Sequence, residues 1–113
     1  MNYKFNEDII LARLKDYIDT TYGQHYSMNK IQSTEFIFDA EQGEGFCIGN
    51  IIKYAQRFGK KDGRSEKDLY KVIHYAIILL GHLQEEFVLW RNLQEEQEKG
   101  FIDYDEQMQQ DAD

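Results

Sequence analysis

Five basic residues gather in one short stretch of this chain. They are Lys53, Arg57, Lys60, Lys61 and Arg64. The whole chain carries a formal net charge of −8, yet residues 53–83 hold seven bases and only three acids. Arginine can bind two phosphate oxygens at once and lysine adds a compact charge, so a cluster of this kind is typical of a small-anion site. The sequence therefore predicts a phosphate-binding site here.

The spacing of these bases aligns them on one side of a helix. At about 100° per residue, Asn50, Lys53 and Arg57 fall on one stripe, with Tyr54 at its border. The residues expected on the opposite, apolar side are Ile48, Ile51, Ala55 and Phe58. Lys53 and Arg57 can then point into a pocket away from the core, so their substitution should leave stability nearly unchanged. The alternative is that they form only the solvated side of the helix.

A second polar stripe is predicted on the following helix. Its members are Asp68, Lys71, Tyr75, His82 and Glu86. Two such stripes on adjacent helices could face each other across a pocket. Carboxylates are ligands that Mg²⁺ prefers, so Asp68 and Glu86 are candidate Mg²⁺ ligands.

Other chemistries lack their residues in this sequence. No GxxxxGK[ST] loop is present, which excludes an ordinary P-loop kinase. His74 and His82 are eight residues apart and do not have the i, i+4 spacing of a helical zinc pair. Cys47 is the only cysteine, so we expect it to be a small buried apolar residue. The acidic net charge disfavours duplex nucleic acid as a partner.

The elements that must position these residues are predicted to be helices. Proline is absent and aromatic residues make up 14% of the 113, which favours one folded all-α domain. We expect helices over about Glu7–Thr21, Thr34–Ala40, Gly45–Phe58 and Glu66–Glu98. The residues expected at their ends are Asn6, Ser33 and Ser65 as N-caps, with Asp68 reaching back to Ser65, and Gly23, Gly59 and Gly100 as C-terminal breaks. The domain would span residues 1–100, followed by a flexible acidic tail over residues 101–113.

The long last helix predicts self-association. Ile77, Ile78, Leu79 and Leu80 point in four directions around it, and such a segment needs cover on all sides. We expect a homo-oligomer formed by helix packing, the alternative being the central helix of a compact monomer. The longest pure apolar run, Ala76–Leu80, is too short to span a bilayer, and the N-terminus does not resemble a signal peptide. We therefore expect a cytoplasmic protein with no membrane partner.

The order of these residues resembles a known family of small phage proteins. The matching stretches are "HY" at 25–26, "GFCIGNIIKYAQRFGKK" at 45–61 and "EKDLYKVIHYAIILL" at 66–80, within a region of about residues 24–83. The family is described as of unknown function or SaV-like, and it includes the P-loop-less nucleoside monophosphate kinase of short-tailed coliphages. Val72 and Ala76 depart from the residues common at their positions in the family.

The resemblance implies a nucleotide site. His25 and Tyr26 would hold the base, and Asn50 would orient a phosphate or the ribose. The implied nucleotide-binding residues are His25, Tyr26, Asn50, Lys53, Tyr54, Arg57, Lys60, Lys61, Lys71 and Tyr75. For catalysis, the resemblance implies Lys53, Arg57 and Asp68, with Mg²⁺ as cofactor.

Three functions remain open from the sequence. The first is a phage nucleotide-binding protein, acting in the infected host cell as a nucleoside or deoxynucleoside monophosphate kinase. The second is binding without turnover, in which the protein sequesters a nucleotide or inhibits a host protein as an anti-defence measure. The third is a MazG-type nucleotide pyrophosphohydrolase, which needs paired carboxylates on two helices. Only Glu41 and Glu44 supply one half of such a set.

Overall fold

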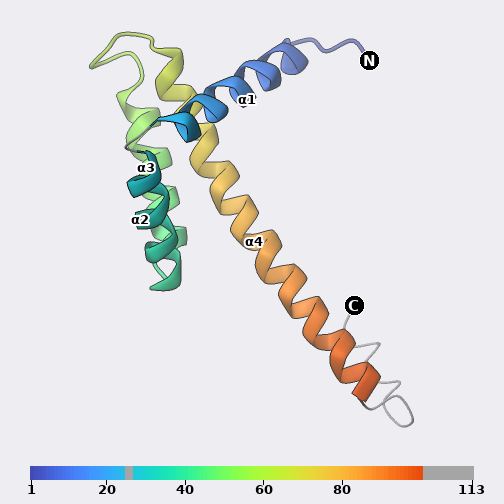
Figure 1. Ribbon diagram of the computed structural model, residues 1–113. Helices are drawn as coiled ribbons and strands as arrows, with labels where there is room; N and C mark the ends of the chain where they lie inside the picture. Colours follow the sequence, from blue (N-terminus) through green and yellow to red (C-terminus); the bar gives the residue numbers. More distant parts are fainter. Residues whose placement is uncertain (25–26, 101–113) are drawn as a thin grey trace. The chain divides into compact units, whose positions relative to one another are not determined.

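The computed structural model describes residues 1–24 and 27–100. Within them the chain forms four helices, which follow one another in the order shown in Figure 1. They are α1 (Glu7–Gly23), α2 (Ser27–Asp39), α3 (Gly43–Arg57) and α4 (Glu66–Gly100). This part of the chain contains no strand, so the predicted all-α class, with three shorter helices and one long C-terminal helix, is confirmed.

The chain divides into two compact units. The first comprises residues 1–79 and holds α1, α2, α3 and the first part of α4, whereas the second begins at Leu80 and holds the rest of α4. The site described below lies wholly in the first unit. The predicted boundary between a helical domain and an acidic tail at residue 100 borders residues 101–113, which are outside the described residues.

The first unit has a small core in which aromatic rings join α1 to α4. Leu14 of α1 is only 4% exposed. Tyr17 of α1 stacks on Tyr70 of α4 with ring centroids 5.4 Å apart. Tyr17 also lies nearly perpendicular to the His74 ring, with centroids 6.4 Å apart. Burial lowers the pKa of His74 from its ordinary value of 6.5. The first part of α4 is therefore fixed to α1 by ring contacts.

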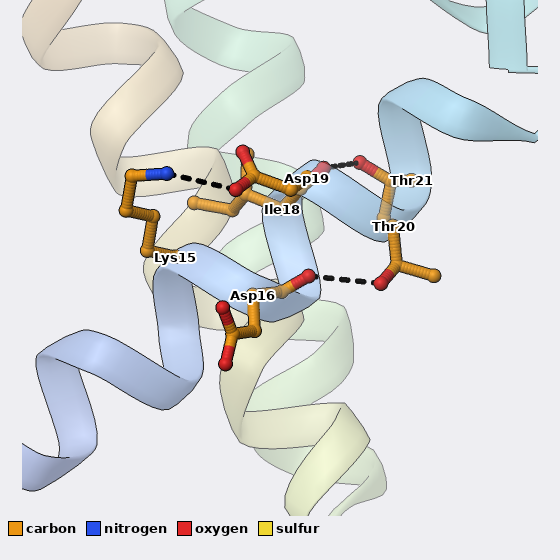
Figure 2. Close-up of polar contacts among 6 residues, drawn as sticks. All are labelled: Lys15, Asp16, Ile18, Asp19, Thr20 and Thr21. Carbon is orange, nitrogen blue, oxygen red and sulfur yellow. Dashed lines mark hydrogen bonds and ion pairs between the residues drawn. The ribbon is translucent and has the colours of Figure 1, made fainter.

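Local polar contacts stabilise α1 itself (Figure 2). Lys15 Nζ lies 2.8 Å from Asp19 Oδ2, one turn further along, and this partner raises the pKa of Lys15. Thr20 Oγ1 donates to the carbonyl oxygen of Asp16, and Thr21 Oγ1 donates to that of Ile18 near the end of the helix. These two hydroxyl groups bond within α1 itself, so polar residues near its end do not interrupt it.

Helices α2 and α3 run side by side and meet closely at their connection (Figure 1). Gly43, the first residue of α3, lies against the ring of Phe38 of α2. A Cβ atom at position 43 would overlap that ring. A residue without a side chain is therefore required where α3 begins.

Helix α2 is longer than the sequence predicted. It begins at Ser27, so Ser33 lies inside it and is not an N-cap. The stretch between the predicted helices over Glu7–Thr21 and Thr34–Ala40 contains serine and asparagine, which often favour turns. Inside α2, however, Thr34 Oγ1 donates to the carbonyl oxygen of Lys30, so the polar side chain is satisfied by its own helix.

Two other predicted caps are wrong in detail. Asn6 adopts a left-handed conformation with φ 58° and makes no capping hydrogen bond, while the backbone N–H of Phe5 donates to Glu7 Oε1. At the start of α4, the backbone N–H of Asp68 donates to the carbonyl oxygen of Ser65, but the Asp68 carboxylate is buried near Arg57. Gly59 has φ +84°, which confirms its left-handed geometry after α3.

The second part of α4 carries exposed apolar side chains. Leu80 is 57% exposed and Leu83 49% exposed.

Among the described helices, α4 is the one that is long and apolar enough to cross a membrane by length and composition, with a mean hydropathy of 1.3 in its most apolar window. The core helix of a soluble protein passes the same test.

Candidate anion site between α3 and α4

The ring of Tyr54 is the centre of the candidate site. Tyr54 is 7% exposed, and three cationic side chains from two helices approach its ring. Lys53 Nζ lies 5.0 Å from the ring centroid, Lys71 Nζ lies 4.7 Å away, and Arg57 Cζ lies 5.8 Å away. A cation within about 6 Å of an aromatic ring is attracted by the negative face of that ring. Tyr54 thus brings together three positive charges that would otherwise repel one another.

The three cations differ in their acidic partners. Arg57 Nη2 lies 3.3 Å from Asp62 Oδ2, and Arg57 Nε lies 3.8 Å from Asp68 Oδ1. Within the described residues, Lys53 and Lys71 form no ion pair. The positive charge of Arg57 is therefore balanced within the protein, while the two lysines supply charge that an anion would neutralise.

Asp68 and Arg57 form a largely buried pair. Asp68 is 3% exposed, and the side chain of Arg57 is 24% exposed. In the part of the chain that the structure describes, Arg57 Nε and Asp68 Oδ2 have no hydrogen-bond partner. The 3.8 Å separation is too long for a hydrogen bond, so the pair is held by charge attraction. Removing Arg57 would leave the buried Asp68 without its counter-charge, whereas Arg57 would still have Asp62 if Asp68 were removed.

The loop between α3 and α4 places further bases beside this pair. The backbone N–H of Gly59 donates to the carbonyl oxygen of Gly63 at 2.7 Å, which closes a tight turn. Lys60 and Lys61 are exposed on this turn. Arg64 lies over the ring of Phe58, with its Cζ 5.6 Å from the centroid. The loop lysines are thus accessible to an anion, and Arg64 is engaged by an aromatic ring.

A second tyrosine supports the central ring from α4. The Tyr75 ring stacks on Tyr54 with centroids 6.1 Å apart and an angle of 10° between the planes. The rings of Phe46 and Tyr75 are T-shaped, with centroids 5.7 Å apart. Burial raises the pKa of Tyr75, with further contributions from Tyr54, Cys47 and Tyr17, so its hydroxyl group stays protonated at neutral pH. Tyr75 therefore serves as a neutral platform beneath Tyr54.

Asn50 has a contact inside its own helix. Its Nδ2 donates to the carbonyl oxygen of Phe46 at 2.9 Å. The amide group is thus used to stabilise α3, and this contact gives no support to the expected role in orienting a phosphate or the ribose. The expected pair His25 and Tyr26 lies outside the described residues.

Helix α3 buries a different side from the predicted one. Ile48 is 44% exposed and Ala55 is exposed, whereas Cys47 is fully buried and Tyr54 nearly so. Cys47 and Tyr54 are seven residues apart, the spacing of two helical turns, and this was the signal that sequence reasoning missed. Burial raises the pKa of the Cys47 thiol. The expectation of a buried Cys47 is confirmed, and the basic stripe borders the core where it was predicted to lie opposite to it.

The predicted Mg²⁺ ligands do not fit a metal site. Asp68 is buried against Arg57, and Glu86 Oε1 lies 3.0 Å from His82 Nε2 on its own helix. In the described ranges, no group of three or more His, Cys, Asp or Glu side chains could hold a metal ion. Of the predicted α4 stripe, Asp68, Lys71 and Tyr75 join the site, whereas His82 and Glu86 belong to the second unit.

The comparisons with known proteins match the part of the chain that carries this site. Residues 20–77 match the family model described as "Protein of unknown function (DUF3310)". The chain is 34% identical over 70 residues to the gene 1.7 protein of Enterobacteria phage T3, which covers 57% of this chain and 43% of that protein. It is 38% identical over 68 residues to the nucleotide kinase gp1.7 of Escherichia phage T7, which covers 55% of this chain and 35% of that protein.

The chain therefore spans less than half the length of these curated relatives. No solved structure matches it. The family model covers half of the sequence, including all of α3 and the basic loop, and the relatives are phage proteins as the resemblance implied. This chain belongs to the family described as "Protein of unknown function (DUF3310)".

Proposed function

We propose that this chain is a phage nucleotide-binding protein whose phosphate site is formed by Lys53 and Lys71 beside Tyr54. The observation that carries the proposal is the approach of both ammonium groups to one buried ring, at 5.0 and 4.7 Å, without an acidic partner in the described residues. A bound phosphate would supply the missing negative charge and accept hydrogen bonds from both lysines. The likeness to a phage protein named a nucleotide kinase supports a nucleotide as the ligand.

Arg57 and the loop lysines complete the proposed site. Asp62 and Asp68 hold the guanidinium group from two sides, which fixes its position near Tyr54. Lys60 and Lys61 are exposed on the adjoining turn and would attract further phosphate oxygens. The site would act in the cytoplasm of the infected host cell, where nucleotides are available.

The finer proposal is a nucleoside monophosphate kinase. Phosphoryl transfer needs mainly the positioning of reactants and the neutralisation of developing charge, and Lys53 and Lys71 would provide that neutralisation. The support comes from the name of the T7 relative, of which this chain covers only 35%. The Mg²⁺ that the resemblance implies stays a prediction, because Asp68 is buried against Arg57 and Glu86 lies beside His82.

The second candidate is binding without turnover. The observation that favours it is the burial of Asp68 against Arg57, because a carboxylate engaged in this way serves structure more readily than catalysis. Such a protein would sequester a nucleotide or use the bound form to contact a host protein. The pyrophosphohydrolase reading has less support, since Glu41 and Glu44 are both exposed beside the start of α3 and belong to no metal-holding group among the described residues.

One experiment separates these functions. The purified chain is incubated with deoxynucleoside monophosphates, ATP and Mg²⁺, and both the products and the retained nucleotides are separated by chromatography. Diphosphate products support the kinase, whereas retention of an unchanged nucleotide supports binding alone. Monophosphate and pyrophosphate formed from added triphosphates would support the pyrophosphohydrolase. If the chain forms no product and also retains no nucleotide, the proposed nucleotide site is contradicted.

A further inference from the structure

The second part of α4 presents a row of apolar side chains to its surroundings. Leu80, Leu83 and Trp90 are 57%, 49% and 41% exposed. The most apolar window of α4 contains no buried residue. Exposed apolar surface of this extent marks an interaction site in soluble proteins. The second unit therefore requires a partner for this side of the helix.

The spacing of the row is that of a two-helix coiled coil. Leu80, Leu83, Phe87 and Trp90 follow one another at intervals of three, four and three residues, which are the a and d positions of two heptads. Gln94 and Gln97 stand at the next two such positions, so the apolar row ends there. A helix with this pattern buries its row against another helix that has the same pattern.

The charges beside the row specify how a second helix would lie. Glu86 immediately precedes an a position and is a g residue, and Arg91 immediately follows a d position and is an e residue. In a parallel coiled coil, each g residue faces the e residue five positions further along the other helix. Glu86 and Arg91 are separated by five residues and carry opposite charges. Both side chains are exposed.

We infer that residues 80–93 bind the same segment of a second copy of this chain, in parallel and in register. Leu80, Leu83 and Trp90 would face the partner, and Glu86 would pair with Arg91 of the partner subunit. The contact of Glu86 Oε1 with His82 is compatible with this pairing, because a carboxylate can accept several hydrogen bonds. In an antiparallel pair centred on the same apolar row, no acidic residue of the other helix lies opposite Arg91.

The same charges disfavour a lipid bilayer as the cover of this helix. Glu85 and Glu86 are adjacent and lie within the apolar stretch between Leu83 and Trp90. Carboxylates in the middle of a membrane-spanning segment are costly and are rarely left facing lipid. In the coiled coil, Glu85 occupies the outward f position and Glu86 the charged flank of the interface.

The mass of the purified full chain in solution tests this interface. Sedimentation equilibrium should give a mass above that of the monomer, which falls on dilution. Leu83→Asp should shift the protein to the monomer, because it places a charge in the row. Asn92→Asp adds the same charge at an outward position and should leave the mass unchanged. A wild-type protein that is monomeric at every concentration, or equal masses for these two variants, would overturn the inference.

A charge exchange tests the parallel orientation. Glu86→Arg and Arg91→Glu should each weaken association several-fold, and the double variant should recover most of the loss. His82→Gln serves as the control for the contact that Glu86→Arg also removes. A double variant no tighter than the single variants would overturn the parallel pairing. If the wild-type chain floats with phosphatidylcholine vesicles and has a monomeric mass in buffer, the inference is overturned, and a membrane rather than a second copy covers this side of α4.

Discussion

Arg57 shows how one side chain can support both a core and a binding site. Its guanidinium group bridges the exposed Asp62 and the buried Asp68 and also approaches the ring of Tyr54. From the sequence, Arg57 was expected on the side of α3 opposite to the core, with little effect on stability. That expectation is wrong, because Asp68 depends on Arg57 for its counter-charge in a site where water has little access.

Arg57→Ala should therefore lower the free energy of unfolding by about 1–3 kcal/mol, the usual cost of leaving a buried polar group unsatisfied. Urea denaturation measures this. Lys60→Ala, an exposed change on the neighbouring turn, should stay within about 0.5 kcal/mol of the wild type. The double variant Arg57→Ala with Asp68→Asn should lose less than the sum of the two single changes. Additive losses would mean that the pair does not interact.

The buried imidazole of His74 predicts a pH dependence of stability. Burial lowers the pKa of His74 in the folded state below its ordinary value of 6.5, so the unfolded chain binds a proton more readily. This stability is fully present above pH 6.5 and is lost as the pH falls from there through the lowered folded pKa. His74→Gln should flatten the stability profile below neutral pH. Equal slopes in the wild type and the variant would show that His74 does not titrate differently on folding.

At the level of the elements, the sequence predicted the helices better than their faces. The starts of α1 and α4 and the break at Gly59 were placed correctly, because charged first turns and glycine act locally. The predicted buried side of α3 was wrong. Counting aliphatic residues placed Ile48 and Ala55 in the core and left Tyr54 at its border. Which side of α3 is buried depends on the contacts of Tyr54 and Phe46 with Tyr75 of α4, and no local pattern contains those contacts.

The connection between α2 and α3 gives a matched pair of glycine substitutions. Gly43→Ala should destabilise the protein by about 1–3 kcal/mol, because the new methyl group would overlap the ring of Phe38. Gly49→Ala lies in the same helix with nothing within 4 Å of the new Cβ atom, and it should stabilise by about 0.5–1 kcal/mol through helix propensity. Thermal unfolding followed by circular dichroism compares the two. Equal melting temperatures would contradict the close approach of α2 to Gly43.

At the level of the whole molecule, charge is divided along the chain in a way that suits a small anionic ligand. The formal net charge is −8, yet the basic residues of the site all lie between residues 53 and 71. Such a molecule repels extended polyanions while a local positive field attracts a single nucleotide. The sequence predicted this cluster because basic residues can be counted along the chain without knowledge of the fold. It did not predict that Lys53 and Lys71 meet at Tyr54, because that meeting depends on how α3 packs against α4.

The most direct test of the central claim compares nucleotide affinity in charge variants of the full chain. Each of the four common deoxynucleoside monophosphates is titrated by calorimetry into the wild type, Lys53→Ala, Lys71→Ala and Lys67→Ala. For the nucleotide that binds, loss of either site lysine should weaken affinity by about 1.5–3 kcal/mol, the usual worth of a hydrogen bond to a charged group. Lys67→Ala removes an exposed charge four residues from Lys71 and should leave affinity unchanged. Equal affinities in all four proteins, or no binding by the wild type, would contradict a phosphate site at Tyr54.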